Sequence, residues 1–286
     1  MAILTTKFRL TLPPLLLILC FLLTACSRPF FYPDQHIRLT PDKLGINYHD
    51  VSLTAKAGTV LHAWHLSPKT KAKGVILFLH GNAENISTHI HNVSWLYEAG
   101  YEVLLLDYRG YGLSPGRPTL PNVFQDIDSA AHWLSDRSHS QKLPAYWLGQ
   151  SLGASLSSYY LSHHKVEGLK AVILDAPFSS YKSISREKFS ELWLTWPLQY
   201  PLSWLIDNRY SPNKAVHKWP QLPLLVFSSS KDPIVPNHHT LKLLEQFNAG
   251  TSKIEHINTN STHTGTYNHP AYREKTLNFL KKYNKS

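Results

Sequence analysis

Cysteine is scarce in this sequence of 286 residues: Cys20 and Cys26 are its two thiols, and none follows residue 26. The rest of the chain therefore cannot form an intrachain disulfide, ligate zinc through sulfur or use a cysteine nucleophile. Blocks of like charge are also absent, although Lys and Arg exceed Asp and Glu by 29 − 19 = 10. Because no basic stripe or nucleic-acid motif accompanies this excess, we expect no nucleic-acid partner. Positive charge fits an anionic membrane surface instead.

The first residues have the pattern of an export signal. Lys7 and Arg9 precede an uncharged stretch, residues 10–27, whose apolar centre spans residues 15–23. A basic start, a short apolar run and small residues after it are typical of a secretory signal. The end of this stretch, Leu23-Thr24-Ala25-Cys26, resembles the lipobox of bacterial lipoproteins. That resemblance implies a lipoprotein signal peptide at residues 1–25, cleaved before a Cys26 whose sulfur carries a diacylglycerol.

An uncleaved membrane anchor is the alternative, although 18 uncharged residues are at the short limit for crossing a bilayer. Both alternatives export the rest of the chain. We expect a protein lipid-anchored to the bacterial cell envelope, on the periplasmic face. Ser27 resembles the second residue of lipoproteins sorted to the outer membrane. Residues 26–41 contain Pro29, Pro33 and Pro41 with little periodicity, which predicts a lipidated tether before a domain at residues 42–286.

Short apolar runs alternate with longer amphipathic ones through this domain. Runs at 51–55 and 59–66 alternate as an antiparallel pair, and continuous apolar runs follow at 74–79, 102–106, 145–148, 169–174, 222–227 and 253–257. Helical patterns lie between them at 84–99, 121–136, 151–164, 237–248 and 270–283. This alternation predicts an α/β fold with a mostly parallel central sheet and helices on both faces. Functional residues should follow the carboxyl ends of its strands.

Residues 177–220 interrupt the alternation and carry half of the eight tryptophans. Because this segment leaves one strand end and returns to the next strand, it is predicted to be an insertion over the carboxyl edge of the sheet. Two interpretations are open. It is either a helical excursion packed on the body by its aromatic side chains, or a cap whose apolar inner face lines a substrate pocket.

The pattern Gly-x-Ser-x-Gly occurs twice, around Ser114 and around Ser151. Catalysis by such a serine requires a tight turn between a strand and a helix. Ser151 follows the apolar run 145–148 and opens a helical pattern, whereas Ser114 is followed by Pro115 and Gly116. We therefore predict Ser151 as the nucleophile and Ser114 as a loop residue.

A serine nucleophile needs a base and a group that orients the base, in the chain order serine, acid, histidine. Asp175 and Asp232 both follow late strands; we favour Asp232 and expect Asp175 to shape the entrance to the insertion. His263 lies between the last strand and the last helix, where the base belongs. The pairs at 163–164 and 238–239 are expected on the solvated surface. No histidine pair has the His-x-x-x-His spacing with a supporting acid, so we predict no metal site.

The developing oxyanion needs two N–H donors. Leu152 supplies one directly after the nucleophile. The other is expected from the turn after strand 74–79, which reads His80-Gly81-Asn82-Ala83. Asn82 is the candidate, with His80 as a structural residue of the turn.

Together these segments resemble the α/β-hydrolase superfamily, in particular the membrane-attached and lipoprotein hydrolases with His-Gly-Asn-Ala and Asp-Tyr-Arg-Gly-Tyr-Gly motifs. Both motifs are present here, at residues 80–83 and 107–112. The resemblance implies Ser151 as nucleophile, Asp232 as orienter, His263 as base, and Asn82 and Leu152 as oxyanion donors. It also implies a structural role for the loop of Asp107 and Arg109. Serines stand at 229 and 261, where the family often has glycine.

Known members hydrolyse esters, thioesters including protein-linked palmitoyl groups, or small acyl substrates. The expected function is therefore a membrane-anchored serine hydrolase of lipid-like or small acyl esters or thioesters, with no cofactor. Two alternatives remain: a non-catalytic ligand-binding lipoprotein of the envelope on the same fold, and a serine peptidase with the same triad.

Overall fold

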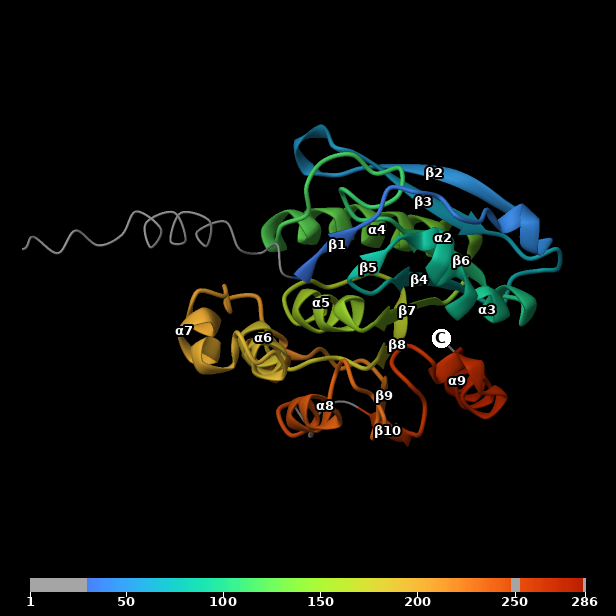
Figure 1. Cartoon of the computed structure of the whole chain (residues 1–286). Coiled ribbons are helices and arrows are strands. Elements are labelled where there is room, and N and C mark those ends of the chain that lie inside the picture. The colour runs from blue at the N-terminus through green and yellow to red at the C-terminus, as the bar shows by residue number, and fades with distance from the viewer. Residues whose placement is uncertain (1–29, 248–252, 285–286) are drawn as a thin grey trace, which may run out of the picture.

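An eight-stranded sheet forms the centre of the computed structural model, which describes residues 30–247 and 253–284 (Figure 1). The predicted signal peptide and Cys26 lie outside the described residues. The strand order is β10-β9-β8-β7-β4-β6-β3-β2. The bounds are β2 (Tyr48–Thr54), β3 (Val60–Leu66), β4 (Val75–Leu79), β6 (Glu102–Leu106), β7 (Ala145–Gln150), β8 (Leu169–Asp175), β9 (Leu224–Ser229) and β10 (Ile254–Thr259).

The expected fold class is confirmed. Strand β3 runs antiparallel to both β2 and β6. The remaining neighbours in the sheet, from β6 through β4, β7, β8 and β9 to β10, pair in parallel. Each of the eight strands in this sheet begins and ends within three residues of its predicted run. The parallel strands were recognisable because both of their faces are buried, so that their sequences are continuously apolar.

Helices cover the two faces of the sheet (Figure 1). The bounds are α4 (Leu120–Gln141), α5 (Leu152–Leu161) and α8 (Asn237–Leu244) on one face, and α2 (Ile86–His89), α3 (Ser94–Glu98) and α9 (Pro270–Lys282) on the other. Side chains of β4 alternate between the two cores: Leu77 and Leu79 pack with the first set, Ile76 and Phe78 with the second. The single helix expected at 84–99 is divided by a 3-10 turn, Ile90–Asn92. Among the described helices, none combines the length and hydropathy needed to cross a bilayer.

The described part of the predicted tether is packed against the domain. Phe30 and Phe31 are buried, and the short strand β1 (Tyr32–Pro33) pairs in parallel with β5 (Ala83–Glu84). The Asn85 side chain donates hydrogen bonds to the carbonyls of residues 34 and 36. The prolines suggested a free linker, but the two phenylalanine rings bury apolar surface, which offsets the entropy lost on ordering the segment. Described residues before 42 therefore pack as part of the body, although they were predicted as tether.

The insertion forms a small helical cap between β8 and β9. It contains α6 (Tyr181–Glu191), α7 (Gln199–Trp204) and the 3-10 turns Trp196–Leu198, Pro212–Lys214 and Val216–Lys218. Of its four tryptophans, Trp219 is buried against Phe247, whereas Trp193, Trp196 and Trp204 are exposed. The expectation that the aromatic side chains pack the insertion onto the body is therefore wrong for these three.

The loop after β6 is held by a buried ion pair. Arg109 donates from Nε to both carboxylate oxygens of Asp126, at 2.9 and 3.0 Å, and its backbone N–H donates to the same carboxylate. Asp126 lies on α4 and is fully buried. The pair thus connects the loop of residues 107–112 to the helix that packs on the sheet.

We predict that Arg109→Ala lowers the free energy of unfolding by about 3–5 kcal/mol, because it leaves the Asp126 carboxylate buried without its partner. Denaturant titration measures the change. Arg209→Ala is the matched control: Arg209 pairs with Asp207 at 2.8 Å on the exposed surface, and its loss should change stability little. Equal losses in the two variants would contradict the role given to the buried pair.

Candidate active site

Ser151 lies on a strained turn between β7 and α5. Its backbone has φ 54° and ψ −116°, a conformation that residues other than glycine rarely adopt. The neighbouring glycines are required by space: a Cβ at Gly153 would lie 2.1 Å from the Leu79 carbonyl oxygen, and one at Gly149 would lie 2.7 Å from the Gly153 carbonyl oxygen. The turn therefore has the geometry of a nucleophile elbow, which holds the serine at the carboxyl edge of the sheet.

The structure brings Ser151, His263 and Asp232 into one hydrogen-bonded line. His263 Nε2 lies 2.9 Å from Ser151 Oγ, and His263 Nδ1 lies 2.6 Å from Asp232 Oδ2. The other carboxylate oxygen accepts from the N–H groups of Ile234 and Val235 at 2.8 and 2.9 Å. Burial raises the pKa of Asp232, but the hydrogen bonds from His263 and the two backbone groups outweigh it and hold the pKa below its ordinary value.

This line determines the tautomer of the histidine. An ionised carboxylate can only accept, so His263 donates from Nδ1 to Asp232. Nε2 is then the acceptor and faces the Ser151 hydroxyl. The arrangement can take the proton from Ser151 while the carboxylate stabilises the resulting imidazolium.

Asp175 ends β8, directly before the insertion, and the side-chain hydrogen bonds seen for it in the described residues are to groups other than His263. It is buried and accepts hydrogen bonds from Gln150 Nε2 at 2.9 Å and from Thr266 Oγ1 at 2.8 Å. Its backbone carbonyl accepts from the Ser151 N–H at 2.8 Å. Burial raises the pKa of Asp175. Because Gln150 ends β7 and Thr266 follows His263, Asp175 joins the nucleophile turn to the histidine loop.

The two predicted oxyanion donors lie beside the nucleophile. Leu152 is the first residue of α5, where backbone N–H groups have no partner within the helix. A Cβ at Gly81 would lie 3.7 Å from Ser151 Cβ, so the turn that contains Asn82 faces the serine. Both Asn82 and Leu152 line the cavity next to Ser151.

Two tyrosines hold the turn that contains Asn82, and the sequence analysis missed them. The Tyr111 hydroxyl donates to the Asn82 carbonyl at 2.7 Å, and the Tyr108 hydroxyl donates to the His80 carbonyl at 3.2 Å. The Tyr32 N–H also donates to the Asn82 carbonyl, at 2.8 Å. The signal was present in the Asp-Tyr-Arg-Gly-Tyr-Gly motif, whose tyrosines are both buried.

In the second Gly-x-Ser-x-Gly sequence, the Ser114 hydroxyl is hydrogen-bonded to backbone groups. Ser114 Oγ donates to the Asp107 carbonyl at 2.7 Å and accepts from the His62 N–H at 2.9 Å. Asp107 Oδ1 accepts from the Ile86 N–H at 2.9 Å. Ser114 is thus engaged in closing its own loop, away from the Ser151 site.

The serines at the two expected glycine positions join the acid loop to the histidine loop. The Ser229 hydroxyl donates to the Ser261 carbonyl. Neither residue is among those with positive φ in the described chain, so neither position requires glycine.

A cavity of about 320 Å³ opens beside Ser151. Residues from five parts of the chain line it: Phe30, Tyr32, Asn82, Ser151, Leu152, Phe178, Ile184, Ser185, Lys188, Phe189, Ile234 and Val235. The inner side of α6 therefore contributes to the wall, although the exposed tryptophans of the cap do not. Its one charged side chain, Lys188, donates to Glu191 at 2.7 Å and to the Pro233 carbonyl at 2.9 Å.

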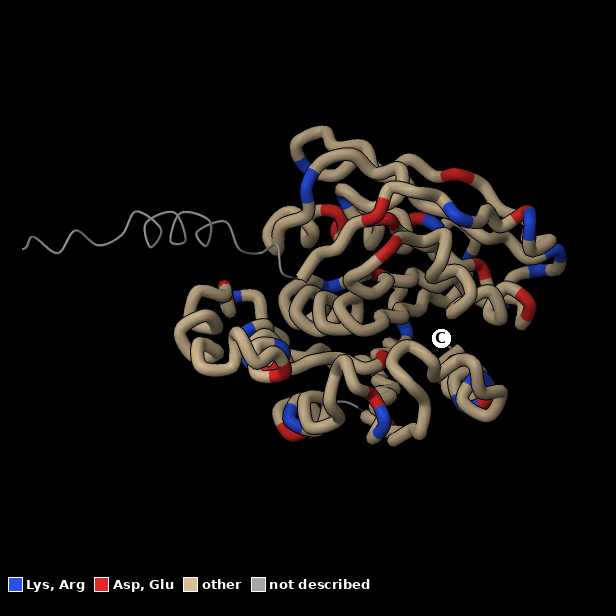
Figure 2. The backbone as a smooth tube through the Cα atoms, in the orientation of Figure 1, with Lys and Arg blue, Asp and Glu red and all other residues tan. Residues whose placement is uncertain are grey.

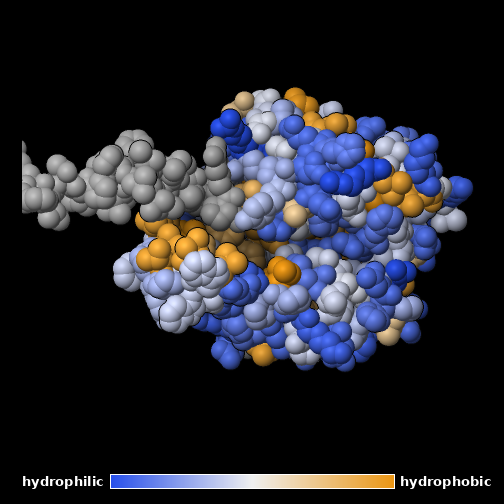
Figure 3. Space-filling model, viewed as in Figure 1, coloured by the Kyte–Doolittle hydropathy of each residue, from blue (hydrophilic) through white to orange (hydrophobic). Residues whose placement is uncertain are grey.

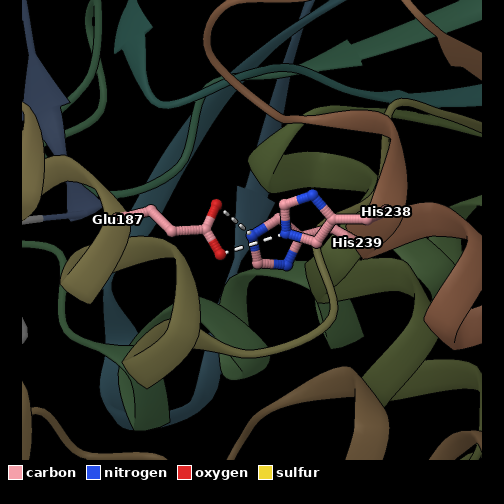
Figure 4. Close-up of side chains that lie close together, drawn as sticks. All are labelled: Glu187, His238 and His239. Atoms are coloured by element: carbon pink, nitrogen blue, oxygen red, sulfur yellow. Dashed lines mark hydrogen bonds and ion pairs between the residues drawn. The ribbon is translucent and has the colours of Figure 1, made fainter.

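The cap is tied to the body by a cluster of Glu187, His238 and His239 (Figure 4). Each ring has Nε2 3.1 Å from a carboxylate oxygen of Glu187. His239 is buried, contrary to the expectation of a solvated pair, and its Nδ1 lies 2.9 Å from Ser179 Oγ. The candidate ligand atoms of the cluster lie within 4.8 Å of one another, a spacing that could hold a metal ion. We assign no ion to it, since the carboxylate already satisfies both facing ring nitrogens.

Comparison with known proteins identifies relatives of the chain and neighbours of its fold. The "Uncharacterized protein YfhR" of Escherichia coli O157:H7 is 32% identical over 260 residues, which cover 88% of this chain and 86% of that protein. The "Alpha/beta hydrolase domain-containing protein WAV2" of Arabidopsis thaliana is 27% identical over 86% of this chain and 82% of its own. The esterase Pf2001 of Pyrococcus furiosus shares the fold, with a TM-score of 0.72 and 22% identity over 89% of this chain and 97% of that one.

A family model described as "Serine aminopeptidase, S33" matches residues 70–221, more than half of the chain. The matched range includes the strand, turn and helix around Ser151. The chain therefore belongs to the serine aminopeptidase S33 family, and with it to the α/β-hydrolase superfamily of serine hydrolases.

Proposed function

We propose that this serine hydrolase is exported and lipid-anchored, and that it cleaves carboxylic ester or thioester bonds through an acyl-enzyme on Ser151. The observation that carries the proposal is the line of hydrogen bonds from Ser151 through His263 to Asp232, at the mouth of an apolar cavity.

In the first step, Ser151 Oγ attacks the acyl carbonyl carbon while His263 Nε2 takes the hydroxyl proton. The negative charge that develops on the carbonyl oxygen is stabilised by the N–H groups of Leu152 and Asn82. The tetrahedral intermediate then expels the alcohol or thiol, which takes the proton from His263. Water attacks the acyl-enzyme by the same route, releases the carboxylic acid and restores the Ser151 hydroxyl.

The cavity wall favours an acyl ester over a peptide with a free amino terminus. An aminopeptidase must hold the positive charge of that terminus, for which a carboxylate is the natural partner. Among the described residues that line the cavity there is no Asp or Glu, and the charged side chain is the cation Lys188. The P. furiosus neighbour is described as an esterase. A serine peptidase and a non-catalytic binding protein are the alternatives. Fluorophosphonate labelling and the substrate panel described below distinguish them from an esterase.

Anchorage at Cys26 completes the proposal. The lipobox-like sequence 23–26 supports it, as does the excess of positive charge, which favours an anionic membrane surface. Two or more acyl chains on Cys26 would hold the protein stably on the envelope, where a single chain would not.

Ser151→Ala should lower kcat toward a short-chain aryl ester by a factor on the order of 10⁶, because the nucleophile and its base act as a unit. A labelled fluorophosphonate should react with the unaltered protein at Ser151 and should not label the variant. Ser114→Ala is the matched control, since its serine has the same sequence pattern without the elbow; it should keep labelling.

The unaltered protein should hydrolyse acyl esters and acyl thioesters when it is tested on a panel of these compounds and aminoacyl anilides. Preferred cleavage of the anilides would assign the site to a peptidase. Tight ligand retention with no labelling and no turnover would assign it to a binding protein.

Tyr111→Phe should lower kcat by about 2–10-fold with KM nearly unchanged, because a neutral hydrogen bond contributes about 0.5–1.5 kcal/mol. The hydroxyl positions the Asn82 turn and does not touch substrate. Steady-state kinetics on a soluble ester measures kcat and KM separately. Tyr97→Phe, which removes a hydroxyl bonded to the Asn47 N–H far from the site, should leave both constants unchanged. A rise in KM with constant kcat would contradict the positioning role.

Cys26→Ser should abolish incorporation of labelled palmitate into the full chain expressed in a Gram-negative host, because the thioether-linked lipid requires the sulfur. Cys20→Ser, inside the predicted signal, should leave incorporation intact. Equal labelling of both variants would mean that Cys26 is not the lipidation site.

A further inference from the structure

The outer side of the cap carries an unusual concentration of exposed apolar side chains. Of fourteen large apolar residues that are exposed in the described chain, eight lie between residues 192 and 205. Trp193 is 87% exposed, and Trp204 and Leu194 are each 67% exposed. We define the cap patch as Leu192, Trp193, Leu194, Trp196, Leu198, Tyr200, Trp204 and Leu205. Figure 3 shows a hydrophobic area over α6 and α7 on an otherwise mostly hydrophilic face.

The composition of this patch is that of a segment that lies in a membrane interface. Residues 192–206 contain no charged side chain. Glu191 and Asp207 bound them and pair with Lys188 and Arg209, while Lys182 and Arg186 add positive charge on α6. Figure 2 shows basic and acidic segments on the cap. Tryptophan and tyrosine concentrate at the boundary between lipid and water, where leucine enters the acyl layer and basic residues meet phosphate groups. Over residues 181–219, Lys and Arg exceed Asp and Glu by 6 − 3 = 3, which complements an anionic headgroup layer.

The start of the folded body lies against this cap. The Phe30 ring packs edge-on against Tyr181, the first residue of α6, with ring centroids 4.8 Å apart, and Phe30 also lines the cavity. Cys26 precedes Phe30 by four residues, so covalent geometry limits their Cα separation to about 14 Å. A lipid on Cys26 would therefore place the base of the cap and the cavity mouth close to the membrane surface.

We propose that the cap patch docks on the phospholipid bilayer that holds the anchor, and that it orients the cavity toward the lipid–water interface. The inference rests on the proposed anchorage and narrows the proposed substrates to acyl esters or thioesters that partition into the membrane. A second copy of the chain fits the patch less well. A symmetric contact would bring the net positive charge of both caps together, whereas anionic lipid neutralises that charge.

Quenching of tryptophan fluorescence by brominated phospholipid tests the docking. The full lipidated chain is reconstituted into vesicles of phosphatidylethanolamine and phosphatidylglycerol with brominated acyl chains. The quenched fraction should fall at least about threefold in the variant with Trp193→Ala, Trp196→Ala and Trp204→Ala together, since bromine on acyl chains quenches the side chains that enter the interface. Trp133→Phe, on α4 and away from the cap, is the matched control and should quench like the unaltered protein.

Activity separates this inference from the proposed function. The triple variant should hydrolyse a soluble short-chain ester within about twofold of the unaltered rate, which also shows that it folds. Its rate on a long-chain ester dissolved in vesicles should fall by about tenfold, the cost of losing one or two large apolar contacts with lipid.

Equal quenching in the triple variant and the unaltered chain overturns the docking, even where ester turnover supports the hydrolase. A dimer in detergent that dissociates on the triple substitution also overturns it, because the patch would then be covered by a second copy. Failure of all ester turnover refutes the proposed function, while the quenching result still decides whether the patch contacts lipid.

Discussion

The contact between the turn after β7 and the end of β4 is the constraint on which the site depends. Residue 153 has no room for a side chain, because a Cβ there would lie 2.1 Å from the Leu79 carbonyl oxygen. Since β4 leads directly into the turn that contains Asn82, this contact places Ser151 beside the predicted oxyanion donors. Asp232 and His263 follow β9 and β10, whose carboxyl ends lie at the same edge. Their reach to Ser151 is therefore a consequence of strand order.

The sheet and the residues of the site could be predicted because their signals are local. Strands buried on both faces are continuously apolar, and Ser151 differs from Ser114 in what surrounds it: a strand before it and a helix after it. Asp232 and His263 could be selected by chain order once the strands were placed. The connecting contacts could not. Asp175 accepts hydrogen bonds from Gln150 and Thr266, which lie 25 and 91 positions from it in the sequence. No local pattern indicates such partners.

The tryptophans of the cap show a second limit of sequence reasoning. An aromatic-rich segment suggests a core or a pocket, because burying such side chains is strongly favourable. Here α6 and α7 pack on each other. Ile184 and Phe189 of α6 face the cavity. Trp193, Trp196 and Trp204 are exposed, and among the described residues no element covers them. The pattern identified the residues as important for packing, but only the arrangement of the helices determines which side of the cap they occupy.

The same geometry connects the start of the body to the catalytic turn. The Asn82 carbonyl accepts from both the Tyr32 N–H and the Tyr111 hydroxyl, so the segment around Tyr32 holds the predicted oxyanion turn from one side. A free linker over residues 26–41 would let the body lie tens of ångströms from its anchor in any orientation, since 16 flexible residues span about 22 Å on average and about 50 Å when extended. Because Phe30 lines the cavity, covalent geometry confines the proposed anchor at Cys26 to about 14 Å from the cavity wall. Under the proposed anchorage, a tether this short keeps the cavity near the membrane without fixing which way it faces. Docking of the exposed apolar cap would then select the orientation in which the cavity faces the lipid.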